Sequence, residues 1–299
     1  MKRAAFIVAL ALLSTAAEAR TYQRGRFLMG TICEIRVPPG HDQQVEAAYA
    51  EARRIETMLS TWTTESELAR VNRGEIAPSK ELQSLLDAMH DWSRRTDGAF
   101  DPRVKALVDV WQIRGDGAVP SRDAIALARA QTQIEEGSFG KGYAIDRMLA
   151  LLPRDEVSID FGGQIAVRGT LRVDVADPAD RHKPVLSLEL RDESISTSSG
   201  SEKTFSAGGR TFSHILDPRT GDALPPRGSV SVIATDALTA DILSTALYVM
   251  GEDDGLRWAD ANNIAAIFIT SDRKVRLSAA AREHVRGLRV LDQNFSVKE

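Results

Sequence analysis

Two oxygen-bearing side chains stand four residues apart in an apolar segment of the chain, Asp241 and Thr245. On a helix they would project from the same face, one turn apart. Carboxylate and hydroxyl oxygens suit Mg²⁺, which takes few protein ligands and leaves room for phosphate oxygens and water. A polar helix cap or a hydrogen bond between the two residues would explain the pair equally well. Cysteine and histidine clusters with zinc spacing are absent from the sequence.

Other segments suggest a ligand with phosphates and rings. Residues 140–142, Gly-Lys-Gly, open a predicted helix whose exposed amides could bind an anion, although a plain helix start would look the same. Trp62 could be a stacking surface or an aromatic at the rim of the core. His214 could be structural or accept a proton near neutral pH. Residues 217–221, Asp-Pro-Arg-Thr-Gly, are also an ordinary turn sequence. Together, a lysine at a glycine-flanked helix start, an aromatic and a hard-cation pair indicate a nucleotide diphosphate.

Hydrophobic periodicity predicts the elements that must position these residues. The predicted helices cover residues 45–59, 82–92, 141–152, 238–250 and 255–261. The predicted strands cover residues 31–37, 157–161, 171–175, 186–190, 230–234 and 265–270. Because strands and helices do not alternate regularly, we expect an α+β fold in one compact domain, and not a doubly wound parallel sheet.

The first residues have the order of a cleavable secretory signal: two basic residues, an apolar run over residues 4–13, and small residues ending at Ala19. We therefore expect residues 1–19 to be removed and residues 20–299 to act in the periplasm. The apolar run is too short for a stable membrane-spanning helix, and no cysteine near the cleavage site offers a lipid attachment point. We expect no stable membrane span.

The charge balance argues against nucleic-acid binding. The chain has 38 Lys and Arg residues against 42 Asp and Glu, a net charge of −4. A nucleic-acid binder would need a basic face to displace counterions from phosphates. Cys33 is the only cysteine, so an internal disulfide is impossible and stability must come from burial.

The chemistry-bearing segments, taken in their order along the chain, resemble the ApbE family, the FAD:protein FMN transferases of bacterial envelopes. They are Met-Gly-Thr at 29–31, Leu-Ser-Thr-Trp at 59–62 with Ser-Glu-Leu at 66–68 and Val-Asn at 71–72, Gly-Ala-Phe-Asp-Pro at 98–102, Gly-Lys-Gly-Tyr-Ala-Ile-Asp at 140–146, His-Ile-Leu-Asp-Pro-Arg-Thr-Gly at 214–221, and Thr-Ala-Asp-Ile-Leu-Ser-Thr-Ala-Leu at 239–247. The last three together are quite specific. The resemblance implies one T-fold-like α+β domain of mixed, largely antiparallel sheets with packed helices.

The resemblance also implies roles for individual residues. The positions that would bind FAD are Met29, Trp62, Ala99, Phe100, Asp101, Glu135, Lys141 and His214. The positions that would bind Mg²⁺ are the backbone carbonyl of Ser138 and the side chains of Asp241 and Thr245. Two positions depart from the family pattern: Glu135 stands where the family often has Asp, and Gln164 replaces a commonly acidic residue. Neither change removes the metal pair. Because the first half of the segment at 140–146 and the whole segment at 214–221 are intact, we expect an active enzyme.

The reaction that the resemblance implies is an in-line displacement at the FMN phosphorus of FAD. A Thr or Ser hydroxyl of an acceptor flavoprotein in the cell envelope attacks, and AMP leaves. Mg²⁺ at Asp241 would neutralise the charge that builds on AMP, while His214 could take the hydroxyl proton or only grip the flavin. Two other functions fit the same residues. One is a periplasmic FAD pyrophosphatase that releases FMN and AMP, and the other is a non-catalytic exported FAD carrier, which would not need the hard-cation pair.

Overall fold

The computed structural model describes residues 22–298, so the expected signal segment at residues 1–19 lies outside the described part. The helices there are α1 (Asp42–Leu59), α2 (Glu67–Asn72), α3 (Lys80–Arg95), α4 (Lys105–Val110), α5 (Arg122–Arg129), α6 (Gly140–Leu149), α7 (Ala237–Met250), α8 (Glu252–Ala261) and α9 (Ala279–His284). The strands are β1 (Tyr22–Leu28), β2 (Thr31–Val37), β3 (Val157–Phe161), β4 (Gln164–Arg168), β5 (Thr170–Asp177), β6 (Asp180–Arg191), β7 (Ser194–Ser199), β8 (Thr204–Ala207), β9 (Arg210–Ser213), β10 (Ser229–Ala234), β11 (Ala265–Ile269), β12 (Lys274–Leu277), β13 (Arg286–Val290) and β14 (Ser296–Lys298).

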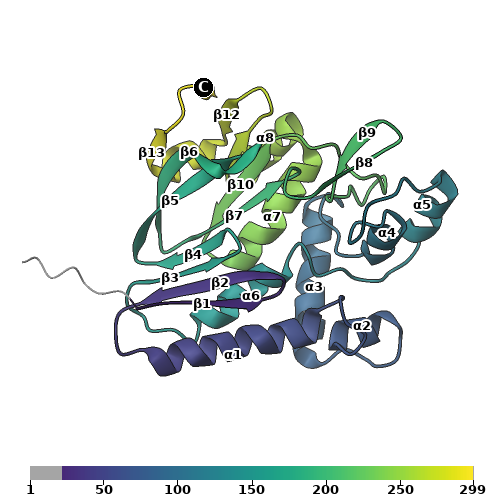
Figure 1. Cartoon of the computed structure of the whole chain (residues 1–299), viewed down its shortest axis with the longest axis horizontal. Coiled ribbons are helices and arrows are strands. Elements are labelled where there is room, and N and C mark those ends of the chain that lie inside the picture. Colours follow the sequence, from purple (N-terminus) through teal and green to yellow (C-terminus); the bar gives the residue numbers. More distant parts are fainter. Residues whose placement is uncertain (1–21, 299) are drawn as a thin grey trace, which may run out of the picture.

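A large central sheet organises the molecule (Figure 1). Its strand order is β1-β2-β3-β4-β7-β10-β11-β12-β14, and every neighbouring pair is antiparallel except β12 with β14. A second sheet, β13-β6-β5, is also antiparallel, and β8 and β9 form a separate hairpin. The expected α+β class with largely antiparallel sheets is confirmed.

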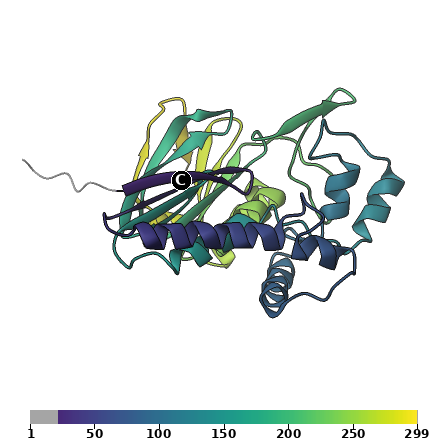
Figure 2. The same cartoon turned by 60° about the horizontal axis from the view of Figure 1, so that its bottom comes forward.

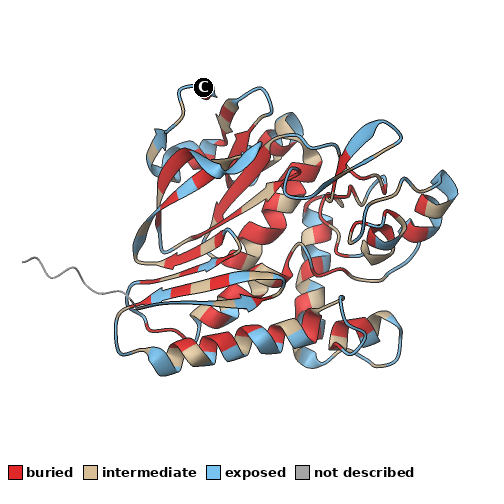
Figure 3. Ribbon diagram, in the orientation of Figure 1, coloured by how far each residue is buried: buried red, intermediate tan, exposed pale blue. Residues whose placement is uncertain are grey.

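The central sheet is covered on both faces. Helix α7 packs on β7 and β10, and α6 packs between α7 and α1, so these helices share one face of the sheet (Figures 1 and 2). Their apolar side chains form the main core with Ile35 and Val232 from the sheet. On the other face, Ile195 and Ile267 pack with Leu188 of the small sheet in a second core. Figure 3 shows α7 buried along most of its length, which explains why its sequence is apolar on nearly every side.

A smaller lobe, made of α4, α5 and the β8–β9 hairpin, packs beside these layers (Figure 2). Its core is aromatic: Trp111 lies 5.3 Å from Phe212 and 6.3 Å from Phe205, measured between ring centroids. The indole N–H of Trp111 donates to the carbonyl of Gly221 at 2.8 Å. The turn at 217–221 is therefore anchored to the lobe, which supports its structural interpretation.

All five predicted helices and six predicted strands are confirmed, with ends that shift by a few residues or, in β6, by more. The elements that periodicity did not predict are short, such as α2 and α4, or polar, such as β7. Among residues 22–298, no helix combines the length and the apolar character that crossing a membrane requires.

Helices α6 and α7 lie close together at Gly142. A Cβ there would lie 2.5 Å from the carbonyl oxygen of Ala237 and 2.8 Å from Cβ of Asp241. Such distances force a backbone shift, so a glycine is needed for the two helices to meet this closely.

We expect Gly142→Ala to lower the free energy of unfolding by roughly 1–3 kcal/mol, because overpacking against backbone outweighs the better helix propensity of alanine. Urea unfolding checks this. Gly25→Ala is the control, since its nearest new contact would be an ordinary 3.5 Å. A Gly142→Ala protein as stable as the wild type would contradict the close-packing account.

Candidate active site

A cavity of about 320 Å³ lies where α6, α7 and β7 meet the smaller lobe. Every residue that the sequence predicts for the site lines this cavity except Met29. The side chain of Met29 instead lies beside α6, with its Cε 3.2 Å from where a Cβ of Gly140 would be. The structure thus brings the two sets of predicted residues, those for FAD and those for the metal, to one place.

Asp241 is almost completely buried, and its carboxylate is held from two sides. The backbone amide of Gly142 donates to Oδ2 at 2.9 Å, and the hydroxyl of Ser196 lies 3.5 Å from Oδ1. Burial raises the pKa of this carboxyl above its ordinary value, while the positive charge of Lys141 and the two hydrogen bonds oppose the rise. The ionised carboxylate therefore has too little positive charge around it, and a bound cation would supply that charge.

Successive side chains of a strand point to opposite faces of the sheet, so every second residue of β7 faces α7. These residues place hydroxyls beside Asp241. Ser196 and Ser198 both face α7, where Ser198 is 2.9 Å from the hydroxyl of Ser244 and 3.3 Å from that of Thr245. Thr245 also reaches back to the carbonyl of Asp241 at 3.4 Å. The Asp241 carboxylate and the Thr245 hydroxyl thus lie within one patch of hard oxygen donors.

The third predicted metal donor is the carbonyl of Ser138, just before α6. In a continuing helix this carbonyl would accept from the amide of Gly142, but that amide donates to Asp241. Within residues 22–298 no hydrogen bond reaches the Ser138 carbonyl oxygen. The described residues also contain no group of three or more His, Cys, Asp or Glu side chains that could hold a metal. One carboxylate, one hydroxyl and one open carbonyl fit a cation such as Mg²⁺, which relies on few protein ligands.

Asp146 fixes the start of α7 above this patch. Its carboxylate accepts from the amides of Ala237 at 2.8 Å and Leu238 at 3.0 Å. Burial raises the pKa of Asp146 to about 6, against the effect of these two hydrogen bonds. The last residue of the Gly-Lys-Gly-Tyr-Ala-Ile-Asp segment therefore accepts from the first amides of the helix that carries Asp241, which is a structural role.

Lys141 lines the cavity from the first turn of α6. In the part of the chain that the structure describes, no carboxylate oxygen lies within ion-pair distance of its ammonium group. The charge is thus available to an anion, and the positive end of the helix dipole reinforces it.

His214 sits at the base of the β8–β9 hairpin, half-buried. Burial lowers the pKa of its imidazole below the ordinary value, so the ring is neutral at pH 7. Its Nδ1 lies 3.3 Å from the carbonyl oxygen of Lys203. Because a carbonyl only accepts, Nδ1 carries the proton and Nε2 keeps its lone pair free for another proton.

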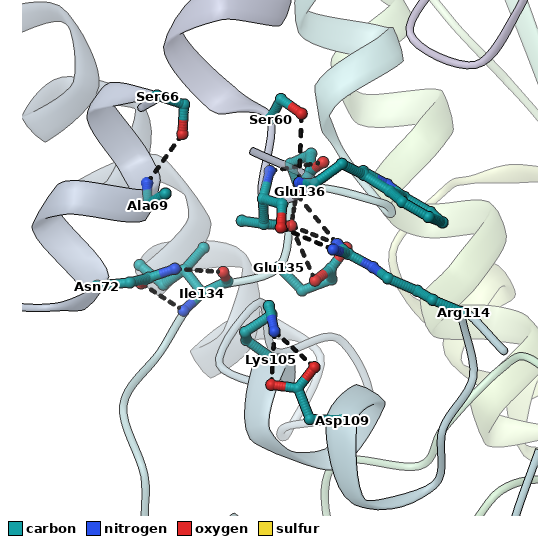
Figure 4. Close-up of polar contacts among 12 residues, drawn as sticks. Ser60, Ser66, Ala69, Asn72, Lys105, Asp109, Arg114, Ile134, Glu135 and Glu136 are labelled. Atoms are coloured by element: carbon teal, nitrogen blue, oxygen red, sulfur yellow. Dashed lines mark hydrogen bonds and ion pairs between the residues drawn. The ribbon is translucent and has the colours of Figure 1, made fainter. Parts of the chain in front are cut away.

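A network of buried charges closes another side of the cavity (Figure 4). Arg114 is 2.5 Å from Oε1 of Glu135, and Thr61 donates to Oε2 of the same carboxylate at 3.0 Å. Burial, then the neighbouring Glu136, raises the pKa of Glu135. Asp101, on the same wall, pairs with Arg103, whose hydrogen bonds hold the pKa of Asp101 below its ordinary value although burial opposes this.

Comparison with known proteins fits this geometry. The family model that describes the ApbE family matches residues 29–268. The chain belongs to the ApbE family.

Two relatives align with this chain over almost their whole length. A protein of Treponema pallidum named FAD:protein FMN transferase is 30% identical, with 93% of this chain and 92% of the relative aligned. One of Klebsiella pneumoniae with the same name is 28% identical over 88% and 93%. Among solved structures, the ApbE protein of Thermotoga maritima has a TM-score of 0.81 at 27% identity, covering 89% of this chain and 100% of that one. The apo flavinyl transferase ApbE of Pseudomonas stutzeri has a TM-score of 0.77 at 26% identity, covering 88% and 96%.

Gln164, one of the departures from the family pattern, lies buried at the start of β4 in this ApbE protein. Its side-chain amide donates to the carbonyl of Ala237 at 2.8 Å, at the first turn of α7. It therefore supports the same helix end as Asp146.

Sequence reasoning missed several contributors to the cavity, among them Arg114, Lys203 and the serines of β7. Arg114 belongs to no recognised motif. The signal for β7 was the serine-rich run at 194–199, which was not interpreted as a strand. The roles that the resemblance assigns to the other cavity residues stay predictions.

We expect the titration midpoint of His214 to lie below 6.5, because burial disfavours the imidazolium. Proton NMR of the ring resonances from pH 5 to pH 8 measures this. The chain has five histidines, and His214→Gln assigns the signal by its loss. A midpoint at or above 6.5 would contradict the expected effect of burial, and a midpoint above 7 would make the imidazolium the main form at pH 7.

Proposed function

We propose that this ApbE protein is an FAD:protein FMN transferase that uses Mg²⁺ to move FMN from FAD to a Thr or Ser hydroxyl of an acceptor protein, releasing AMP. The observation that carries the proposal is the buried Asp241 carboxylate beside the unpaired Lys141 in a cavity lined by the FAD positions of the family. The names of the relatives support the overall activity.

The metal requirement follows from the donor set. Asp241, Thr245 and the Ser138 carbonyl would hold Mg²⁺, which would neutralise charge on the pyrophosphate and on the leaving AMP. Lys141 adds positive charge to the phosphates from the start of α6, so the dinucleotide is oriented with its pyrophosphate toward the α6–α7 junction.

The acceptor hydroxyl must lose a proton as its oxygen bonds to the FMN phosphorus. The bond from that phosphorus to the AMP oxygen breaks, and AMP takes the electron pair. His214 holds its own proton at Nδ1, and its Nε2 takes the hydroxyl proton. A neutral imidazole at pH 7 is the form that this step needs.

We also propose that the protein acts in the periplasm on an acceptor flavoprotein of the cell envelope. The order of basic, apolar and small residues over 1–19 supports export.

The direct test incubates the mature protein with FAD, Mg²⁺ and envelope proteins. We expect AMP by chromatography and covalent flavin fluorescence on an acceptor band in a denaturing gel. AMP with free FMN and no labelled protein would instead establish an FAD pyrophosphatase. Bound FAD without AMP would establish a carrier and overturn the proposal.

Asp241→Asn should abolish AMP release and the rise in Tm on adding Mg²⁺. A ligand at one hundred times its Kd stabilises by about 2.7 kcal/mol, a shift of a few degrees, and the neutral amide is a poor ligand for a hard cation. Without Mg²⁺, the variant should be at least as stable as the wild type at pH 7. A raised folded-state pKa means that ionising Asp241 weakens folding once the pH exceeds the unfolded value.

Thermal unfolding with and without Mg²⁺ measures both effects. Asp236→Asn is the matched control, because Asp236 caps the same helix through Thr239 and Asn caps equally well. If Asp241→Asn kept its Mg²⁺ response, the ion would have to bind elsewhere.

A further inference from the structure

Arg114 contacts two residues that the family resemblance assigns to FAD, and nothing in that resemblance assigns a role to Arg114 itself. Its guanidinium carbon lies 4.2 Å from the centroid of the Trp62 ring. The same group makes the ion pair with Glu135 at 2.5 Å and donates from Nη1 to the backbone carbonyl of Thr61 at 2.7 Å (Figure 4). One side chain therefore ties the loop that carries Trp62 to the loop that carries Glu135.

The backbone that carries Arg114 is anchored in the smaller lobe. Arg114 lies in the turn after α4, and two residues just before it, Trp111 and Ile113, are buried in the aromatic core of the lobe. The amide of Ile113 donates to the carbonyl of Val108 at 3.0 Å. Arg114 thus extends from a fixed backbone.

Trp62 depends on this support. It is 70% exposed although it lines the cavity. The guanidinium lies over one face of the indole, which leaves the other face for a ligand. A flat ring can stack there, and the cation behind the indole holds the ring in a single orientation.

The charges explain why the residue is an arginine. Glu135 and Glu136 are both buried, and Arg114 reaches the first at 2.5 Å and the second at 4.0 Å. A guanidinium can donate in its plane to Glu135 and Thr61 while its face stacks on Trp62. A lysine ammonium keeps the charge but has no planar face, so it cannot do both.

We propose that Arg114 is a positioning residue that presents the free face of Trp62 as the stacking surface for one of the two flat ring systems of FAD. This rests on the proposed function only in taking FAD as the substrate.

The test compares Arg114→Lys with the wild type. We expect the KM for FAD to rise about tenfold while kcat and the Mg²⁺ dependence change less than threefold, since the metal site is untouched. Arg54→Lys is the matched control: Arg54 also bridges two carboxylates, Glu51 at 2.8 Å and Glu81 at 2.7 Å, but outside this cavity. The KM of Arg54→Lys for FAD should stay within twofold of the wild-type value.

Two comparisons separate the possible failures. A wild type that neither binds FAD nor releases AMP would refute the proposed function. An active wild type with equal KM values in Arg114→Lys and Arg54→Lys would refute only the role of Arg114. A parallel loss of kcat would overturn it as well, because it would place Arg114 in the chemical step or in general stability.

Competition by AMP and by FMN identifies the ring that stacks. The competitor that carries that ring should lose affinity in Arg114→Lys, and the other should bind as it does to the wild type. Unchanged affinity for both would contradict stacking on Trp62.

A double-mutant cycle with Trp62→Ala shows whether Arg114 acts through the indole. In the Trp62→Ala background, Arg114→Lys should raise the KM for FAD less than twofold. A full tenfold effect in that background would show that Arg114 acts by another route and would overturn the proposal.

Discussion

Burial of one carboxylate with too little positive charge around it is the constraint on which the rest of the site depends. Asp241 receives one backbone amide and one serine hydroxyl, and Lys141 is the nearby cation that favours its ionised form. A carboxylate in such a place costs stability unless it is paired. In the proposed function, a hard cation beside a diphosphate would supply the positive charge that this buried carboxylate lacks.

The layered architecture builds that site from distant parts of the sequence. Gly142 lets α6 approach α7 until its amide reaches Asp241, and Asp146 fixes the start of α7 from the same helix. Strand β7 adds hydroxyls from the sheet beneath. The smaller lobe supplies the opposite wall, where Arg114 joins Trp62 to Glu135. The patch of hard oxygen donors around Asp241 and the indole of Trp62 are therefore carried by separate layers that meet at the cavity.

Much of this was predictable because local patterns determine it. The four-residue spacing of Asp241 and Thr245 places both on one helix face, and the long amphipathic helices follow from their period. The serines of β7 escaped prediction because every residue of this strand except Ile195 carries a hydroxyl, so apolar and polar residues do not alternate along it. Arg114 escaped because its importance comes from its contacts with Trp62 and Glu135, which are distant in the sequence, and no local pattern encodes such contacts. The position of Met29 beside Gly140, away from the cavity lining, likewise depends on packing between distant segments.

The most direct measurement is anomalous X-ray scattering from crystals of the mature protein grown with FAD and Mn²⁺, which accepts the same oxygen ligands as Mg²⁺. The account predicts one strong anomalous peak, from a Mn²⁺ ion within ligand distance of the Asp241 carboxylate and the Thr245 hydroxyl. The pyrophosphate of FAD should contact the same ion. A peak elsewhere, or FAD bound with its pyrophosphate far from Asp241, would contradict the account.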